Sequence, residues 1–101
     1  AMASQVQQKS QCGERRDLSK SQARLEKQVS RAESEIASME TKVKARDLEL
    51  ADPALYQEHG RWSELQREQE GWKKELERLT ARWESLSDEL QDVRDKLTAI
   101  G

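Results

Sequence analysis

The fold is decided by residues 62–100, WSELQREQEGWKKELERLTARWESLSDELQDVRDKLTAI. Apolar residues recur in this stretch at alternating spacings of three and four, and Gln69 is the only interruption. The apolar positions are Trp62, Leu65, Trp72, Leu76, Leu79, Trp83, Leu86, Leu90, Val93, Leu97 and Ile100. Spacings that average about 3.5 residues place these side chains on one narrow stripe of a helix, which is the pattern of a coiled coil. Such a helix needs a partner.

A second, weaker seam precedes the first with the same strict spacing. It consists of Leu18, Gln22, Leu25, Val29, Ala32, Ile36, Met39, Val43, Arg46 and Leu50. Ser19 can accept a hydrogen bond from the backbone three residues on while Gln22 reaches back, so this pair predicts a helix start. The sequence therefore predicts a helix over residues 19–50, which would extend about 48 Å at about 1.5 Å per residue.

The two seams are separated by a break at Asp52-Pro53. Aspartate is a good N-cap and proline is preset for the first helical position, so residues 54–56 can form one or two helical turns before Gly60. We place a hinge at residues 51–61 and a second helix at residues 62–100. A connection this short returns the second helix antiparallel to the first. The predicted fold is all-α: an antiparallel two-helix coiled-coil hairpin over residues 18–101, with a short helical turn at the tip.

The register of the pair can be predicted from which residues face each other. In one of two plausible alignments, small Ala32 faces large Trp83, and the polar seam residues Arg46 and Gln69 share one layer. This alignment also sets Glu35 near Arg82, Lys42 near Glu75 and Glu40 near Lys73, against one repulsion of Glu49 with Glu68. The other alignment places Gln69 opposite Met39 and Glu35 opposite Glu75, so we prefer the first. Flanking pairs are worth only a few tenths of a kcal/mol each.

Composition limits the class of protein. With 101 residues, 38% charged, 34% hydrophobic and no Phe, the chain has too little apolar material for a layered globular core, so an elongated helical protein is expected. The net charge of −2 argues against a strongly basic nucleic-acid module but leaves local patches open. No apolar run or signal-peptide core points to a membrane or to secretion. The single cysteine, Cys12, fits a cytoplasmic location and could cross-link two chains in air.

The first residues lack apolar periodicity, and we expect residues 1–17 to be a disordered tail or linker. Ala1-Met2 suggests that residue 1 remains from tag removal and that the chain is a domain cut from a longer protein.

A basic stripe is the main candidate for function. It consists of Lys20, Arg24, Lys27 and Arg31, preceded by Arg15 and Arg16. The stripe positions face away from the partner helix, so we do not expect intramolecular ion pairs to use up their charge. Near the end of the second helix an acidic outer stripe is formed by Glu84, Asp88, Asp92 and Asp95. The basic stripe is either a solvated face or a phosphate-binding surface that does not discriminate sequence.

Other chemistry is not indicated. One histidine, His59, and one cysteine cannot supply a zinc site of the usual ligands or a Cys-His pair. The carboxylates lie on solvated helix faces, which lack the burial that tunes a catalytic acid, and no glycine-rich phosphate loop is present. We expect no catalytic residues, no metal, no cofactor and no small-molecule substrate.

A resemblance to a known family adds to these inferences. Residues 50–56, Leu-Ala-Asp-Pro-Ala-Leu-Tyr, are followed by a heptad helix that contains residues 79–86, Leu-Thr-Ala-Arg-Trp-Glu-Ser-Leu. Together they resemble the C-terminal coiled-coil domain of bacterial ABC-F ATPases, particularly the Uup branch, over roughly residues 18–90. The resemblance implies a helical hairpin that binds DNA or assists ribosome-associated action, downstream of two ATP-binding cassettes. Neither cassette is in this chain, which is therefore not expected to bind ATP or act as an enzyme.

Two functions stay open at this stage. The first is an accessory module that binds DNA or ribosomal RNA weakly through the basic stripe. The second is a structural spacer or a docking hairpin for a protein partner. We expect a monomer that does not associate with a membrane. A third alternative is a homodimer formed through the seams after the hinge opens.

Overall fold

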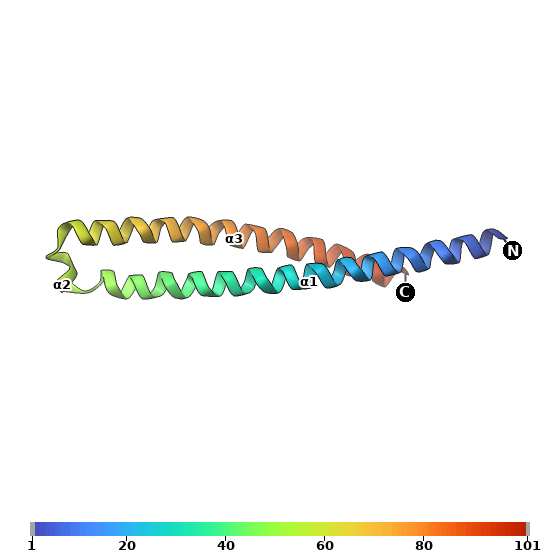
Figure 1. Cartoon of the computed structure of the whole chain (residues 1–101), viewed down its shortest axis with the longest axis horizontal. Coiled ribbons are helices and arrows are strands. Elements are labelled where there is room, and N and C mark those ends of the chain that lie inside the picture. The colour runs from blue at the N-terminus through green and yellow to red at the C-terminus, as the bar shows by residue number, and fades with distance from the viewer. Residues whose placement is uncertain (1, 101) are drawn as a thin grey trace. The chain divides into compact units, whose positions relative to one another are not determined.

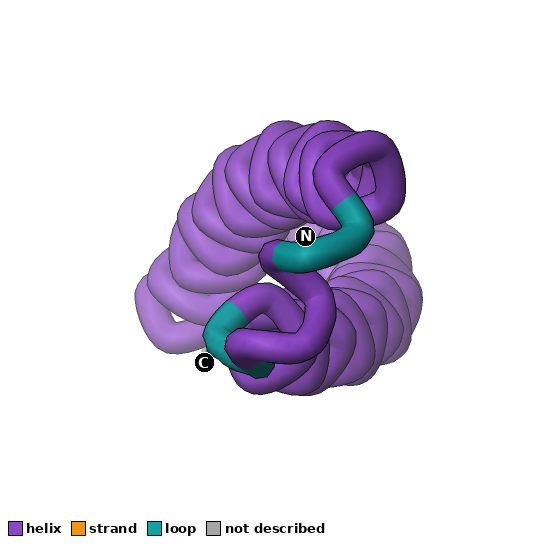
Figure 2. The backbone as a smooth tube through the Cα atoms, turned by 90° about the vertical axis from the view of Figure 1, so that its left-hand side faces the viewer, coloured by secondary structure: helices purple, strands orange, loops and turns teal. Residues whose placement is uncertain are grey.

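The computed structural model describes the backbone of residues 2–100 and the side chains of residues 13–100. It contains α1 (Met2–Leu50), α2 (Pro53–Tyr56) and α3 (His59–Ile100) (Figure 1). Two short loops, residues 51–52 and 57–58, flank α2 (teal in Figure 2), and residues 2–100 contain no strand. The predicted all-α fold class, two long helices that pack on each other with a short helix between them, is confirmed.

Two compact units make up the chain, and α1 and α3 contribute to both. The terminal unit consists of Ala1–Ser30 and Glu84–Gly101, and the tip unit consists of Arg31–Trp83. In the tip unit, α1 leads through α2 into α3, so this unit is an antiparallel hairpin (Figure 1).

The contact face in each unit is the predicted seam. Every seam residue from Leu18 to Ile100 is buried or half-buried. Leu25 and Leu90 are the most buried apolar residues of the terminal unit, and Ala32 and Leu79 are those of the tip unit. Because burial of a large apolar side chain contributes about 1.5–3 kcal/mol, these seams provide most of the stability of the pair.

The tip unit has a polar layer at Arg46 and Gln69, which are 7% and 3% exposed. The Arg46 guanidinium donates to the carbonyl oxygen of Leu65 at 2.7 Å and to Glu68 at 3.0 Å. The Gln69 amide donates to the carbonyl oxygen of Val43 at 3.1 Å and to the Asp47 carboxylate at 2.6 Å. Arg46 therefore bonds to groups that precede Gln69 on α3, and Gln69 bonds to groups on both sides of Arg46 on α1. These bonds satisfy most of the buried polar atoms of the two side chains.

These contacts decide the register within the tip unit. Arg46 reaches a neighbour of Gln69, and the Trp83 indole N–H donates to Glu33, a neighbour of Ala32, at 3.1 Å. Both contacts agree with the predicted alignment of Ala32 with Trp83 and of Arg46 with Gln69. In the alternative alignment Gln69 would face Met39 instead of lying beside Arg46.

The expected flanking pairs are not the ones that form. Within residues 13–100, Glu35 pairs with Arg31 and Glu75 with Arg78, each along its own helix, and not with Arg82 and Lys42. The pair of Glu40 with Lys73 is also not made there. Pairs between residues three or four apart need less side-chain ordering than pairs across a seam, which accounts for the difference. The predicted Glu49–Glu68 repulsion is relieved, because the Arg46 guanidinium lies 3.6 Å from Glu49 and 3.0 Å from Glu68.

The connection between the long helices follows from local capping. Asp52 has an extended backbone (φ −71°, ψ 120°) and caps α2 by accepting a hydrogen bond from the Ala54 amide at 3.0 Å, with Pro53 in the first turn. The Glu58 carbonyl accepts from the Arg61 and Trp62 amides and so starts α3. The predicted helical turn at the tip is present.

Two helix boundaries differ from those predicted. Ser19 lies inside α1, which begins at Met2, so the helix start predicted at Ser19 and Gln22 is not what the structure shows. Residues 2–17 of the expected tail belong to α1, and residue 1 lies outside the described residues. No proline interrupts this region, and extending an existing helix requires no new nucleus. α3 begins at His59 instead of residue 62, since Gly60 takes no positive φ and its backbone is compatible with a helix.

Candidate nucleic-acid interface

Three residues of the predicted basic stripe lie together in the terminal unit. Lys20, Arg24 and Lys27 follow each other at spacings of four and three on α1, and all three are exposed. With about 3.6 residues per turn, they lie on one face of the helix, opposite the face that buries Leu25 and half-buries Val29. The heptad pattern thus places them outside the seam, as predicted.

The charges of these three side chains are available. Within residues 13–100 no carboxylate forms an ion pair with Lys20, Arg24 or Lys27. Glu26 lies between two of them in sequence, but its carboxylate contacts Arg94 of α3 at 3.4 Å. The nearest acid along the chain is therefore turned toward α3, and the stripe keeps a net positive charge.

The two arginines before the stripe differ in position. Both are exposed and lie on helix α1. They are therefore helical and not part of the disordered tail that we predicted. Arg16 is four residues before Lys20 and lies on the same face. Arg15 lies about 140° around the helix axis from Lys20, on the seam side of α1, because it is seven residues before the seam residue Gln22. Arg16 extends the stripe, and Arg15 does not.

Arg31 departs from the prediction. It belongs to the tip unit, and its guanidinium pairs with Glu35 at 3.5 Å. We predicted that no intramolecular ion pair would involve the stripe, and this is wrong at Arg31. A helix brings residues four positions apart side by side, so Glu35 is within reach. The Arg31 side chain is still 84% exposed, so the pair is weak and can exchange for another anion.

The acidic outer stripe also lies in the terminal unit. Glu84, Asp88, Asp92 and Asp95 are all exposed on α3, and Asp95 accepts a hydrogen bond from Gln91 at 3.0 Å. Packed helices are about 8–10 Å apart, close to one Debye length at 0.1 M salt. The acidic stripe therefore weakens anion binding at the basic stripe at low salt more than at physiological salt.

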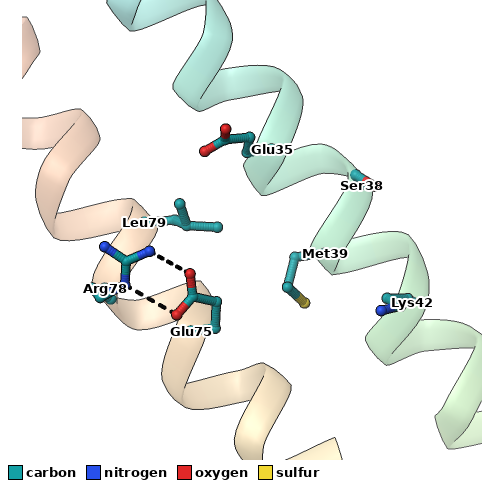
Figure 3. Close-up of a pocket in the computed structure, with 7 residues that line it drawn as sticks. All are labelled: Glu35, Ser38, Met39, Lys42, Glu75, Arg78 and Leu79. Carbon is teal, nitrogen blue, oxygen red and sulfur yellow. Dashed lines mark hydrogen bonds and ion pairs between the residues drawn. The ribbon is translucent and has the colours of Figure 1, made fainter.

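A groove in the tip unit is the second candidate. It is lined by Glu35, Ser38, Met39, Lys42, Glu75, Arg78 and Leu79 (Figure 3). Arg78 donates two hydrogen bonds to Glu75, which hold the pKa of the Glu75 carboxyl below its usual range and raise the pKa of Arg78. The Lys42 ammonium lies 4.7 Å from the centre of the Trp72 ring. The groove has two carboxylates and two cations, and both carboxylates are already paired, Glu75 with Arg78 and Glu35 with Arg31. It therefore favours neither sign of ligand.

Other kinds of site are not indicated in the described part of the chain. Its side chains contain no group of three or more His, Cys, Asp or Glu that could hold a metal ion. No helix there combines the length and apolar character needed to cross a membrane. Cys12 precedes the described side chains.

Sequence reasoning missed the contacts of two residues. Arg46 was expected only as a polar member of the seam, yet its guanidinium also lies 4.4 Å from the centre of the Trp72 ring. Tyr56 stacks on Trp62 with ring centroids 5.5 Å apart. The sequence offers only two signals for these contacts. One is a polar residue at a seam position, and the other is a pair of aromatic residues across the hinge.

The fold defines the class of protein, an antiparallel helical coiled-coil module with a capped turn at its tip. A comparison with family models matches the ABC transporter C-terminal domain over residues 14–88. This match covers most of the chain, which therefore belongs to that family. Neither the comparison with curated proteins nor that with solved structures gives a match.

Proposed function

We propose that the chain is an accessory nucleic-acid-binding module of a cytoplasmic ABC-F type ATPase of the Uup-like branch. It binds DNA or ribosomal RNA through phosphate contacts and without sequence specificity. The observation that carries the proposal is the exposed stripe of Lys20, Arg24 and Lys27, which has no ion-pair partner within residues 13–100. The family match and the resemblance of the Asp52-Pro53 hinge support the proposal that the module belongs to an ABC-F type ATPase.

The spacing of the stripe suits a phosphate backbone. At about 1.5 Å per residue, side chains three and four positions apart are about 4.5 and 6 Å apart along the helix. Long lysine and arginine side chains can adjust from this spacing to successive phosphates. Such contacts orient the protein on nucleic acid but provide no base readout.

Weak binding is expected, with a dissociation constant of about 10⁻⁴–10⁻⁶ M at physiological salt. Three or four phosphate contacts predict a slope of about −3 in a plot of log K against log salt for duplex DNA. We propose that the module acts as a monomer, without enzymatic activity, small-molecule substrate or membrane contact of its own. Sedimentation at several concentrations tests the monomer against a dimer opened at the hinge.

The deciding experiment is fluorescence anisotropy with labelled duplex DNA and labelled RNA over a range of salt concentrations. The triple variant Lys20→Glu, Arg24→Glu, Lys27→Glu should lose binding while its helicity and melting stay nearly unchanged, because these positions lie outside the seam. The matched control reverses three exposed lysines of the tip unit, Lys44, Lys73 and Lys74, and so has the same net charge.

The outcomes separate the two functions. Loss of binding in the stripe variant with retention in the control supports the nucleic-acid interface. Equal binding by the stripe variant and the unaltered chain would show that the stripe is only a solvated face. The alternative of a structural spacer or protein-docking hairpin would then replace the proposal.

A further inference from the structure

The tip of the hairpin has an exposed aromatic surface that the proposed function does not use. Leu48 and Tyr56, 78% and 54% exposed, are the exposed large hydrophobic residues among the described side chains. Tyr56 comes from α2 and stacks on Trp62 of α3, with ring centroids 5.5 Å apart and planes 24° apart. One face of the Tyr56 ring therefore packs on Trp62, and the residue as a whole remains half open to solvent.

This aromatic pair is held in place by the end of α1. The Trp62 indole N–H donates to the carbonyl oxygen of Leu50 at 3.1 Å, one of the carbonyls that a helix end leaves without a backbone partner. Trp62 is half-buried by the seam, and Tyr56 is ordered by α2, which Asp52 caps. A tyrosine fixed before binding loses little side-chain entropy when a partner packs on it, which is why tyrosine and tryptophan are enriched in binding hot spots.

The charge around the pair selects the partner. Residues 46–61 contain four carboxylates, Asp47, Glu49, Asp52 and Glu58, and two arginines, of which Arg46 is buried and lies 3.6 Å from Glu49. The Glu49 and Glu58 side chains are 55% and 64% exposed. Glu58 lies 4.0 Å from Arg61, the limit of an ion pair, so its carboxylate retains capacity for another donor. A nucleic-acid phosphate is repelled here, whereas a cation is attracted.

We propose that this tip surface, defined by Tyr56, Trp62, Glu49, Asp52 and Glu58, binds a protein segment that presents arginine or lysine beside apolar side chains. The partner's cation lies on the open face of the Tyr56 ring, in a cation–π contact, and donates to the Glu58 carboxylate. The partner's apolar side chains pack at the edge of the aromatic pair. This surface lies within the tip unit and is separate from the basic stripe of residues 20–27.

The test uses the ¹⁵N-labelled chain and a short synthetic peptide that alternates arginine and leucine. The Trp62 indole N–H is the reporter, and the indoles of Trp72 and Trp83, which contact residues of the seam region, are internal references. We expect a saturable shift of the Trp62 signal with the arginine peptide. No such shift is expected with a peptide that has glutamate in place of arginine, or with a single-stranded oligonucleotide.

Matched variants locate the contact. Tyr56→Ser should weaken peptide binding about fivefold, whereas Tyr56→Phe should retain it because the ring is kept. Leu48→Ser is the control, since it removes an exposed apolar residue on the outer face of α1. Helicity measured by circular dichroism checks that each variant is folded.

Three results would overturn the proposal. One is the absence of a saturable Trp62 shift at millimolar peptide. Another is a set of peptide-induced signal shifts confined to the acidic stripe at residues 84–95, which would show that the peptide is attracted to carboxylates in general. The third is a Trp62 shift caused by the oligonucleotide, which would assign the tip to nucleic acid. None of these depends on whether the stripe variant binds DNA or RNA.

Discussion

Replacing Arg46 tests the polar layer of the tip unit. In Arg46→Ala the chain loses the hydrogen bond to the Leu65 carbonyl, the contact with the Trp72 ring and the ion pairs with Glu49 and Glu68. The hydrogen bond contributes about 1 kcal/mol and the ring contact about 0.5–1 kcal/mol. Both glutamates are 55% exposed, so each ion pair adds only about 0.2–1 kcal/mol. With the lost packing of the arginine stem, the free energy of unfolding should fall by about 2–4 kcal/mol.

Arg46→Leu is the informative comparison. Leucine fills much of the same space and contributes about 1.5–3 kcal/mol by burial, while Glu49 and Glu68 return to water at little cost. Its free energy of unfolding should therefore stay within about 1 kcal/mol of the unaltered chain. Urea denaturation followed by circular dichroism, at low and high salt, measures both variants. The reasoning is refuted if alanine changes stability by less than about 0.5 kcal/mol, or if leucine is as damaging as alanine.

Two further substitutions test packing and helix propensity. Ala32→Leu should lower the free energy of unfolding by about 1–3 kcal/mol, because Ala32 is 4% exposed and the added atoms overpack its layer. An unchanged or raised denaturation midpoint would reject the pairing with Trp83. Gly71→Ala should raise the free energy of unfolding by about 1 kcal/mol, since a Cβ at this position meets no atom within 4 Å and the backbone is helical. A lower melting temperature for Gly71→Ala would contradict the description of that face as open.

The seam was predictable because it depends on spacing alone. The alternation of three and four residues from Leu18 to Ile100 identifies the buried face without knowledge of the partner, and all of its members are buried or half-buried. The break at Asp52-Pro53 was equally predictable, since both residues have strong local preferences at a helix start. The start of α1 was not, because the preferences of Ser19 and Gln22 are small compared with simple continuation of the helix.

The candidate interface was predictable in part. Spacing placed Lys20, Arg24 and Lys27 on the outer face, and the structure leaves them exposed. Which charges are paired could not be predicted, because long flexible side chains have several carboxylates within reach that differ by only a few tenths of a kcal/mol. Arg31 pairs with Glu35, and Glu26 reaches Arg94.

The sequence by itself determined that the chain forms two long helices, which faces they bury and where the chain turns, because these features follow from local preference and periodicity. Only the tertiary structure decided how the polar seam residues are satisfied and which surface the tip presents. Arg46 is stabilised by groups that α3 brings within reach, namely the Leu65 carbonyl and Glu68. Tyr56 likewise stacks on Trp62, whose indole N–H donates to the carbonyl oxygen of Leu50. Such contacts join different helices, so no pattern within one helix specifies them.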